Sequence, residues 1–248
     1  MGESSHGRHA VTTVNLLRSF ELRRGQERVS LPPGAQRLIA FLALEREQLT
    51  RVYVAGTLWI DYSQDAANAN LRTALWRLRR LPYPLVETTA THVALSSDVV
   101  VDVNETIAVA RSLDRGGDGC GESDSERIVL AGDLLPDWYD DWVVIERERF
   151  RQIRLHALEA LCDALIRRGL YGKAVEVGLI AVAGEPLRES AHRAVMRAHI
   201  AEGNPSEAMR QYELCRHVLE PLGLEPSPAM QDLRRRCGHR DGAVTAAR

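Results

Sequence analysis

Five small residues in the second half of the sequence recur after 34 positions, and this spacing constrains the fold more than any other feature. The pairs are Ala157/Ala191, Ala160/Ala194, Ala164/Ala198, Gly169/Gly203 and Ala174/Ala208. This is the period of tetratricopeptide repeats, in which each helical hairpin buries its apolar face against its neighbours. Small side chains let paired helices approach closely, and each glycine falls at a turn. The sequence therefore predicts a helical array from Asp140 to Leu233, with a further hairpin formed either by the helix around Asp141–Arg154 or by the segment after Pro228.

Residues 66–81, AANANLRTALWRLRRL, predict one amphipathic helix with a basic outer face. Its apolar side follows the i, i+3, i+4, i+7 spacing of a buried helical stripe: Leu71, Ala74, Leu75, Leu78 and Leu81. The other side carries Arg72, Thr73, Trp76, Arg79 and Arg80, with Asn68 and Arg77 on its flanks, and no acidic residue. Arginine and asparagine can make paired hydrogen bonds to guanine and adenine edges. Such a face is either an ordinary solvated surface or a DNA-binding surface. Its single sign favours DNA, because mixed charges stabilise a merely solvated helix better.

The elements around this helix predict an α+β N-terminal winged helix-turn-helix domain. Residues 13–31 read as strands with a turn at Gly25, and Pro32 and Pro33 open a first helix. Thr50 can cap a second helix, and Ser63 or Asp65 can cap the basic one. Residues 85–87 and 93–95 then read as a hairpin around TTATH, and 99–103 as another strand. In this order of strands, three helices and hairpin, the third helix is the recognition helix and the TTATH turn is the wing.

The expected domains follow from these patterns and from changes in composition. We expect a disordered N-terminus over 1–12, the winged helix over 13–103, an all-α tetratricopeptide-like array over 104–236 and a disordered tail over 237–248. Val103–Leu113 reads as a helix, and the Gly-rich, acidic segment 114–126 reads as a mobile loop. The aromatic cluster Asp137–Trp142 is expected to pack at the start of the helical array, with a partner-binding patch as the alternative.

Composition and motifs exclude several classes of protein. The net charge is only −2, so any nucleic-acid contact must come from a local patch. The four cysteines have no CxxC spacing, no nucleotide-binding glycine motif occurs, and the histidines form no known catalytic motif. We therefore expect no metal, no cofactor and no catalytic site. The absence of a signal-like N-terminus and of a long apolar run predicts a cytoplasmic protein without a membrane span.

Two blocks of residues carry a family resemblance. The first is Leu58-Trp59-Ile60-Asp61 followed by NLRTALWRLRR over 70–80. The second begins with AGDLLPDW over 131–138 and continues through Asp141–Val143, Glu146-Arg147, Gly169–Tyr171, Glu185–Leu187, Glu189, His192 and Leu222–Ser227. In this order they resemble the Streptomyces antibiotic regulatory protein (SARP) family over residues 14–235. Its members join an OmpR-like winged helix to a bacterial transcriptional activation domain.

The resemblance implies a sequence-specific transcriptional activator, not an enzyme. The family binds direct repeats in promoters of secondary-metabolite (antibiotic) clusters, recruits RNA polymerase holoenzyme through its sigma factor and other subunits, and acts as a homodimer on DNA. Carried onto this chain, Arg72, Thr73, Trp76 and Arg77 meet major-groove bases, and Arg79 and Arg80 bind phosphate. Asn68 and Asn70 reach phosphate or base edges. The remaining alternative is a helical-repeat adaptor whose winged helix binds protein instead of DNA.

Four positions depart from the family pattern. Ile60 replaces a usual proline, and Arg18 stands where a glycine is common after the first strand. The wing, residues 88–92, lacks the arginine that related wings insert into the minor groove, and His92 is a weak substitute. Trp76 occupies a position that is usually small or polar, so it either gives an unusual DNA preference or packs as core.

Overall fold

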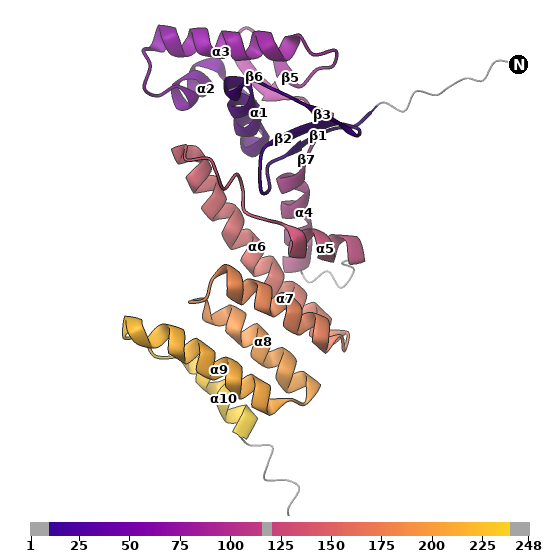
Figure 1. Cartoon of the computed structure of the whole chain (residues 1–248), viewed down its shortest axis with the longest axis vertical. Helices are drawn as coiled ribbons and strands as arrows, with labels where there is room; N and C mark the ends of the chain where they lie inside the picture. The colour runs from indigo at the N-terminus through magenta and orange to yellow at the C-terminus, as the bar shows by residue number, and fades with distance from the viewer. Residues whose placement is uncertain (1–9, 116–120, 239–248) are drawn as a thin grey trace, which may run out of the picture. The chain divides into compact units, whose positions relative to one another are not determined.

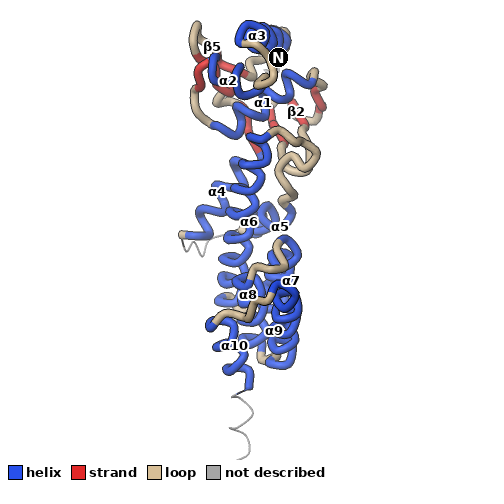
Figure 2. The backbone as a smooth tube through the Cα atoms, turned by 90° about the vertical axis from the view of Figure 1, so that its left-hand side faces the viewer, coloured by secondary structure: helices blue, strands red, loops and turns tan. Residues whose placement is uncertain are grey.

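The computed structural model describes residues 10–115 and 121–238, and these divide into two compact units. Unit 1 comprises residues 1–106 together with 131–150, and unit 2 comprises 107–130 together with the chain from 151 onward. Figure 2 shows that, within the described ranges, every strand belongs to unit 1 while unit 2 is helical. Each unit is described by itself below.

A four-stranded sheet in the order β3-β2-β1-β7 opens unit 1. Its strands are β1 (Thr12–Asn15), β2 (Glu21–Arg24), β3 (Glu27–Val29) and β7 (Val99–Val101). The first three are antiparallel, and β7 pairs parallel with β1. The predicted strands and the turn at Gly25 are confirmed, and Gly25 has the positive φ of 57° that the turn requires.

The three helices of unit 1 are α1 (Pro33–Glu45), α2 (Arg51–Leu58) and α3 (Gln64–Arg79). The predicted caps of the last two are confirmed, because Thr50 Oγ1 accepts from the Tyr53 N–H at 3.3 Å and Ser63 Oγ from the Ala66 N–H at 3.4 Å. A second sheet, in the order β4-β6-β5, comprises β4 (Leu49–Thr50), β5 (Val86–Thr88) and β6 (His92–Leu95). The predicted hairpin is therefore present, and α3 runs beside it (Figure 1). This is the winged helix-turn-helix that the sequence predicts.

Residues 131–150 pack within unit 1, which corrects the place expected for the aromatic cluster. Trp138 stacks on Phe20 with ring centroids 6.0 Å apart, and Trp142 meets the edge of Phe41 at 5.2 Å. The Leu135 N–H also donates to Leu16 O at 2.9 Å, and Leu17 and Leu134 form an isolated β-bridge. The two half-buried tryptophans therefore pack against Phe20 and Phe41 of unit 1 and not against the repeat helices of unit 2.

Unit 2 is built from antiparallel helices. They are α5 (Glu122–Leu130), α7 (Tyr171–Gly184), α8 (Glu189–Glu202), α9 (Pro205–Leu219), the short η1 (Glu220–Leu222) and α10 (Pro228–Gly238), with the later parts of α4 (Asp102–Asp114) and α6 (Asp141–Arg167). The 34-residue repeat is confirmed in space: Gly169 follows α6 and Gly203 follows α8, the first helices of two neighbouring hairpins, with φ of 72° and 91°. Most of the repeating alanines are buried in helix contacts, and α10 packs on α9 as a further hairpin.

Three expected boundaries are wrong where the structure describes them. Thr12 already pairs in β1, so the folded part begins inside the segment expected to be disordered. Residues 122–126, expected to be part of a loop, belong to α5, whose Ile128 is fully buried. Cys237, expected to be part of a disordered tail, is buried at the end of α10. Residues 1–9, 116–120 and 239–248 lie outside the described residues.

Gly178 marks the closest approach between α7 and α8 and gives a stability prediction. A Cβ at Gly178 would lie 2.7 Å from Val195 Cγ2, whereas a Cβ at Gly172 of the same helix would meet nothing within 4 Å. We expect Gly178→Ala to lower the free energy of unfolding by about 1–3 kcal/mol through overpacking. Gly172→Ala should raise it by about 0.5–1 kcal/mol, because alanine favours a helix interior. Urea denaturation followed by circular dichroism measures both, and adding Val195→Ala to Gly178→Ala should recover part of the loss. Equal effects of the two glycine substitutions would contradict the close contact.

His192 predicts how the stability of unit 2 depends on pH. The ring is 2% exposed, its Nδ1 accepts from Gln211 Nε2 at 2.7 Å, and its Nε2 donates to Pro186 O at 2.9 Å. Burial lowers the pKa of His192 below its usual 6.5, against a smaller opposing effect of Glu189. Below pH ~6.5, His192 is protonated in the unfolded chain but stays neutral in the folded chain. Its contribution to the free energy of unfolding is therefore present above pH ~6.5 and is lost as the pH falls below that value.

We therefore expect the free energy of unfolding, measured by urea denaturation, to fall between pH 7.5 and pH 5.5, by at most about 1.4 kcal/mol per pH unit below 6.5. His192→Gln should be less stable at pH 7.5 but should lose this part of the pH dependence. Parallel pH profiles of the two proteins would show that another group is responsible.

Candidate nucleic-acid interface

The exposed face of α3 carries the candidate interface. Its buried side consists of Ala67, Leu71, Ala74, Leu75 and Leu78, which anchor the helix on unit 1. The predicted outer residues Arg72, Thr73, Trp76, Arg77, Arg79 and Arg80 are all exposed. Asn68 and Asn70 are half-buried on its flanks. The structure thus brings the helical part of the predicted site together on one face, as the 3.6-residue period requires.

Trp76 is not core within unit 1, which removes the alternative that it packs there. The ring is 51% exposed and has two arginine partners. The Arg77 and Arg80 guanidinium carbons lie 5.1 and 4.9 Å from its centroid, within the range of cation–π attraction. The tryptophan therefore gathers two positive charges at the middle of the face.

The wing hairpin is tied to α3 by an arginine. Arg79 Nη2 donates to Thr88 Oγ1 of β5 at 2.7 Å, so the side chain predicted as a phosphate ligand also fixes the hairpin against the helix. His92 lies half-buried at the start of β6, with its Nδ1 2.8 Å from Thr91 Oγ1. His92 thus follows the turn of the wing, residues 89–91. Its backbone N–H donates to the Thr89 hydroxyl at 2.9 Å, which closes that turn.

Arg51 is a positively charged residue beside the wing that the sequence reasoning missed. As the first residue of α2, it donates from its backbone N–H to Thr91 O at 2.8 Å and from Nη1 to Thr89 O at 3.4 Å. The wing, residues 88–92, contains no arginine, but the Arg51 side chain places a positive charge beside its turn. The pairing of β4 with β6 brings it there, and no local pattern around Arg51 signals that pairing.

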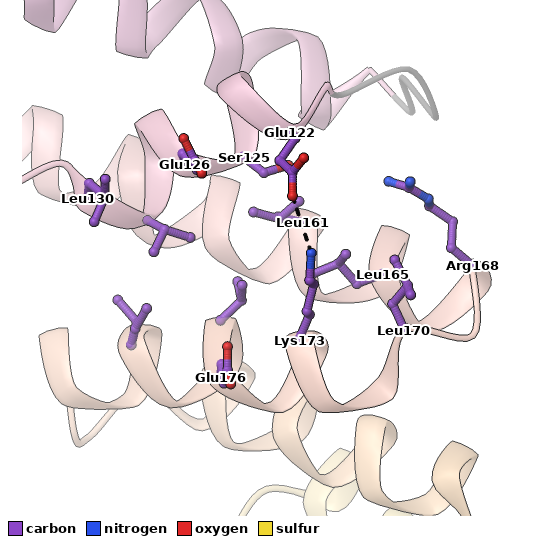
Figure 3. Close-up of a pocket in the computed structure, with 13 residues that line it drawn as sticks. Glu122, Ser125, Glu126, Leu130, Leu161, Leu165, Arg168, Leu170, Lys173 and Glu176 are labelled. Atoms are coloured by element: carbon purple, nitrogen blue, oxygen red, sulfur yellow. Dashed lines mark ion pairs between the residues drawn. The ribbon is translucent and has the colours of Figure 1, made fainter.

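Unit 2 offers a different surface feature, a cavity of about 420 Å³ between α5, α6 and α7 (Figure 3). Leu161, Leu165 and Val177 form part of its apolar lining, and Lys173 Nζ pairs with Glu122 Oε1 across it at 3.5 Å. Its lining includes no histidine or cysteine, and the Ser125 hydroxyl donates to Gly121 O at 3.1 Å. The lining groups therefore provide no nucleophile–base pair of the kind that hydrolytic enzymes use.

Over residues 10–115 and 121–238, no three histidine, cysteine or acidic side chains gather as ligands for an ion. Cys162, Cys215 and Cys237 are buried single thiols, and burial raises the pKa of Cys162 to about 12. No helix in these ranges combines the length and apolarity needed to cross a bilayer.

Comparison with known proteins connects this geometry to a family. Residues 129–237 match the family model described as the bacterial transcriptional activator domain. The regulatory protein AfsR of Streptomyces coelicolor is 28% identical over 233 residues, which cover 90% of this chain and 24% of AfsR. This chain therefore spans about a quarter of that relative.

A solved structure has the same fold over nearly the whole chain. Mycobacterium tuberculosis EmbR, solved in complex with a low-affinity phosphopeptide, superposes with a TM-score of 0.76 at 18% identity and covers 93% of this chain and 66% of EmbR. The likeness confirms the predicted fold class, a winged helix-turn-helix followed by a tetratricopeptide-like array. Residues 129–237 thus match a bacterial transcriptional activator domain, and the chain is similar to AfsR in sequence and to EmbR in fold.

Proposed function

We propose that this chain is a sequence-specific transcriptional activator that docks α3 in the major groove of promoter DNA. One observation carries the proposal: the C-terminal half of α3 and its cap residue present four exposed arginines, Arg72, Arg77, Arg79 and Arg80, and no acidic residue lies between positions 66 and 80. Cationic side chains neutralise phosphates and release counterions, which supplies most of non-specific DNA affinity. The third helix of a winged helix is also the element that enters the major groove. The function proposed is therefore regulatory, not enzymatic.

The residues of the face divide by what they can reach. Arg72, Thr73 and Arg77 are proposed to contact base edges, because arginine pairs bidentately with guanine. Arg79 and Arg80, nearer the helix end, are proposed to contact phosphate, as are Asn68 and Asn70 where they do not reach bases. Phosphate contacts position a protein on DNA, whereas base contacts specify the sequence. His92 and Arg51, which lie at the wing, are proposed to contact phosphates of the DNA backbone.

The proposed partners come from the resemblance to the Streptomyces antibiotic regulatory protein family. We propose that two copies of the chain bind direct repeats in a promoter and recruit RNA polymerase holoenzyme, including its sigma factor, through the activation domain. The regulated genes are proposed to be a secondary-metabolite cluster. The domain match over 129–237 supports the activating role, because that domain is described as a transcriptional activator.

A mobility-shift assay with DNA from upstream of the chain's own gene tests the binding step. We expect a shift at sub-micromolar protein that weakens steeply with salt, because phosphate contacts release counterions. Run-off transcription with RNA polymerase holoenzyme from the same organism then tests activation, and added protein should increase the transcript. The absence of any salt-sensitive shift at micromolar protein would favour the helical-repeat adaptor.

A further inference from the structure

Trp76 lies at the middle of the exposed arc of α3. At ~100° per residue, it is about 40° from Arg72 on one side and about 40° from Arg80 on the other. Its ring is 51% exposed, although tryptophan is the largest apolar side chain on this face. A large aromatic surrounded by polar and charged residues is the arrangement found at the anchor points of binding interfaces. The position therefore suggests a contact with the bound partner.

The two stacked arginines set the orientation of the ring. Arg80 is one helical turn after Trp76 and Arg77 is its neighbour, and both guanidinium carbons lie about 5 Å from the ring centroid. Cation–π attraction restricts the rotation of the indole and also holds the two arginines near it. Trp76 is therefore a preorganised apolar group with two cations close to its ring, not a freely rotating side chain.

Among the groups on base edges in the major groove, only one is apolar. Thymine presents a C5-methyl group, whereas guanine, cytosine and adenine present hydrogen-bond donors and acceptors. An indole ring offers a single N–H donor and a large apolar surface, so its best match there is the methyl group.

We propose that Trp76 is a specificity-determining residue that recognises thymine by packing its indole on the C5-methyl group in the major groove, with Arg77 and Arg80 holding the ring in place. This inference rests on the proposed function and names one base that the same site reads.

The test compares thymine with uracil, which lacks only the methyl group. Duplexes are first selected from a random-sequence library with the wild-type protein, and each thymine of the selected site is then replaced by uracil in turn. We expect wild-type affinity to fall about fourfold at one or two thymines in each repeat, the effect of one buried methyl group. Affinity at the other thymines should stay unchanged.

Protein variants assign the effect to the indole. Trp76→Ala should bind the thymine and uracil duplexes equally, and Trp76→Phe should retain part of the discrimination. Thermal unfolding of both variants should match wild type, because the side chain is half exposed. Uracil sensitivity that persists unchanged in Trp76→Ala, or that is absent in wild type, would overturn the inference while leaving DNA binding intact. Failure of wild type to bind any duplex in a salt-dependent manner would overturn the proposed function, and the inference with it.

Discussion

Replacing Arg147 with Met should destabilise unit 1 by about 2–5 kcal/mol, because the carbonyls of Leu134 and Trp138 lose this donor at ~1–3 kcal/mol each, while Leu135 O keeps the Trp138 N–H at 3.0 Å. Arg147 Nε donates to Leu134 O at 2.7 Å, and Nη2 donates to Leu135 O and to Trp138 O, the latter at 2.7 Å. Leu134 and Leu135 are fully buried, and Leu135 has the unfavourable φ of 40°. One guanidinium of α6 thus holds the strained loop over residues 134–138 against that helix. Urea denaturation followed by tryptophan fluorescence measures the loss.

Arg149 of the same helix provides the matched control. Its side chain is 60% exposed and pairs only with Glu146 at 3.3 Å among the residues described. Arg149→Met should change the free energy of unfolding by at most about 0.5 kcal/mol, as exposed helix pairs do. Similar urea midpoints for the two variants would show that Arg147 does not stabilise the loop.

Patterns within a few helical turns were enough to predict much of the fold. The apolar stripe of α3, the caps Thr50 and Ser63 and the turns at Gly25, Gly169 and Gly203 all depend on neighbouring residues, and the structure has each of them. The repeat was visible because helical hairpins recur at a fixed period. The basic face of α3 was predictable for the same reason, since one period fixes which side chains share a face.

Contacts between distant segments were not predictable from such patterns. The placement of Trp138 and Trp142 in unit 1 depends on the pairing of residues 134–135 with 16–17, more than 100 positions earlier in the chain. Arg51 reaches the wing through the two-residue strand β4, which is too short to leave a sequence signal. Arg18 shows how structure explains a departure from the family. Its φ of 72° lies in the region that glycine adopts without strain, which fits the expectation of a glycine at this position.

Removing Arg77 and Arg80 together should produce the largest loss of DNA binding, about 100-fold to 1,000-fold at 0.1 M salt. The base contact proposed for Arg77 contributes ~1–3 kcal/mol, and the phosphate contact proposed for Arg80 adds to it. The loss of affinity in the double variant should exceed the sum expected if the two arginines acted as independent charges. Both guanidiniums lie about 5 Å from the Trp76 ring, so the double variant removes both cation–π partners of Trp76. Fluorescence anisotropy with a selected duplex over a series of salt concentrations measures affinity and salt slope together.

The single variants separate the two roles. Arg77→Ala should weaken specific binding and leave binding to random DNA nearly unchanged, whereas Arg80→Ala should weaken both and reduce the salt slope by about one. Arg234→Ala with Arg235→Ala is the matched control, since it removes two exposed arginines of α10, one of which also stacks on an aromatic ring, Tyr212 at 5.4 Å. Net charge changes equally in both double variants, so general electrostatic attraction predicts equal losses. Equal losses would therefore contradict a docking role for α3, and a loss confined to Arg77 and Arg80 would place the DNA contact on that helix.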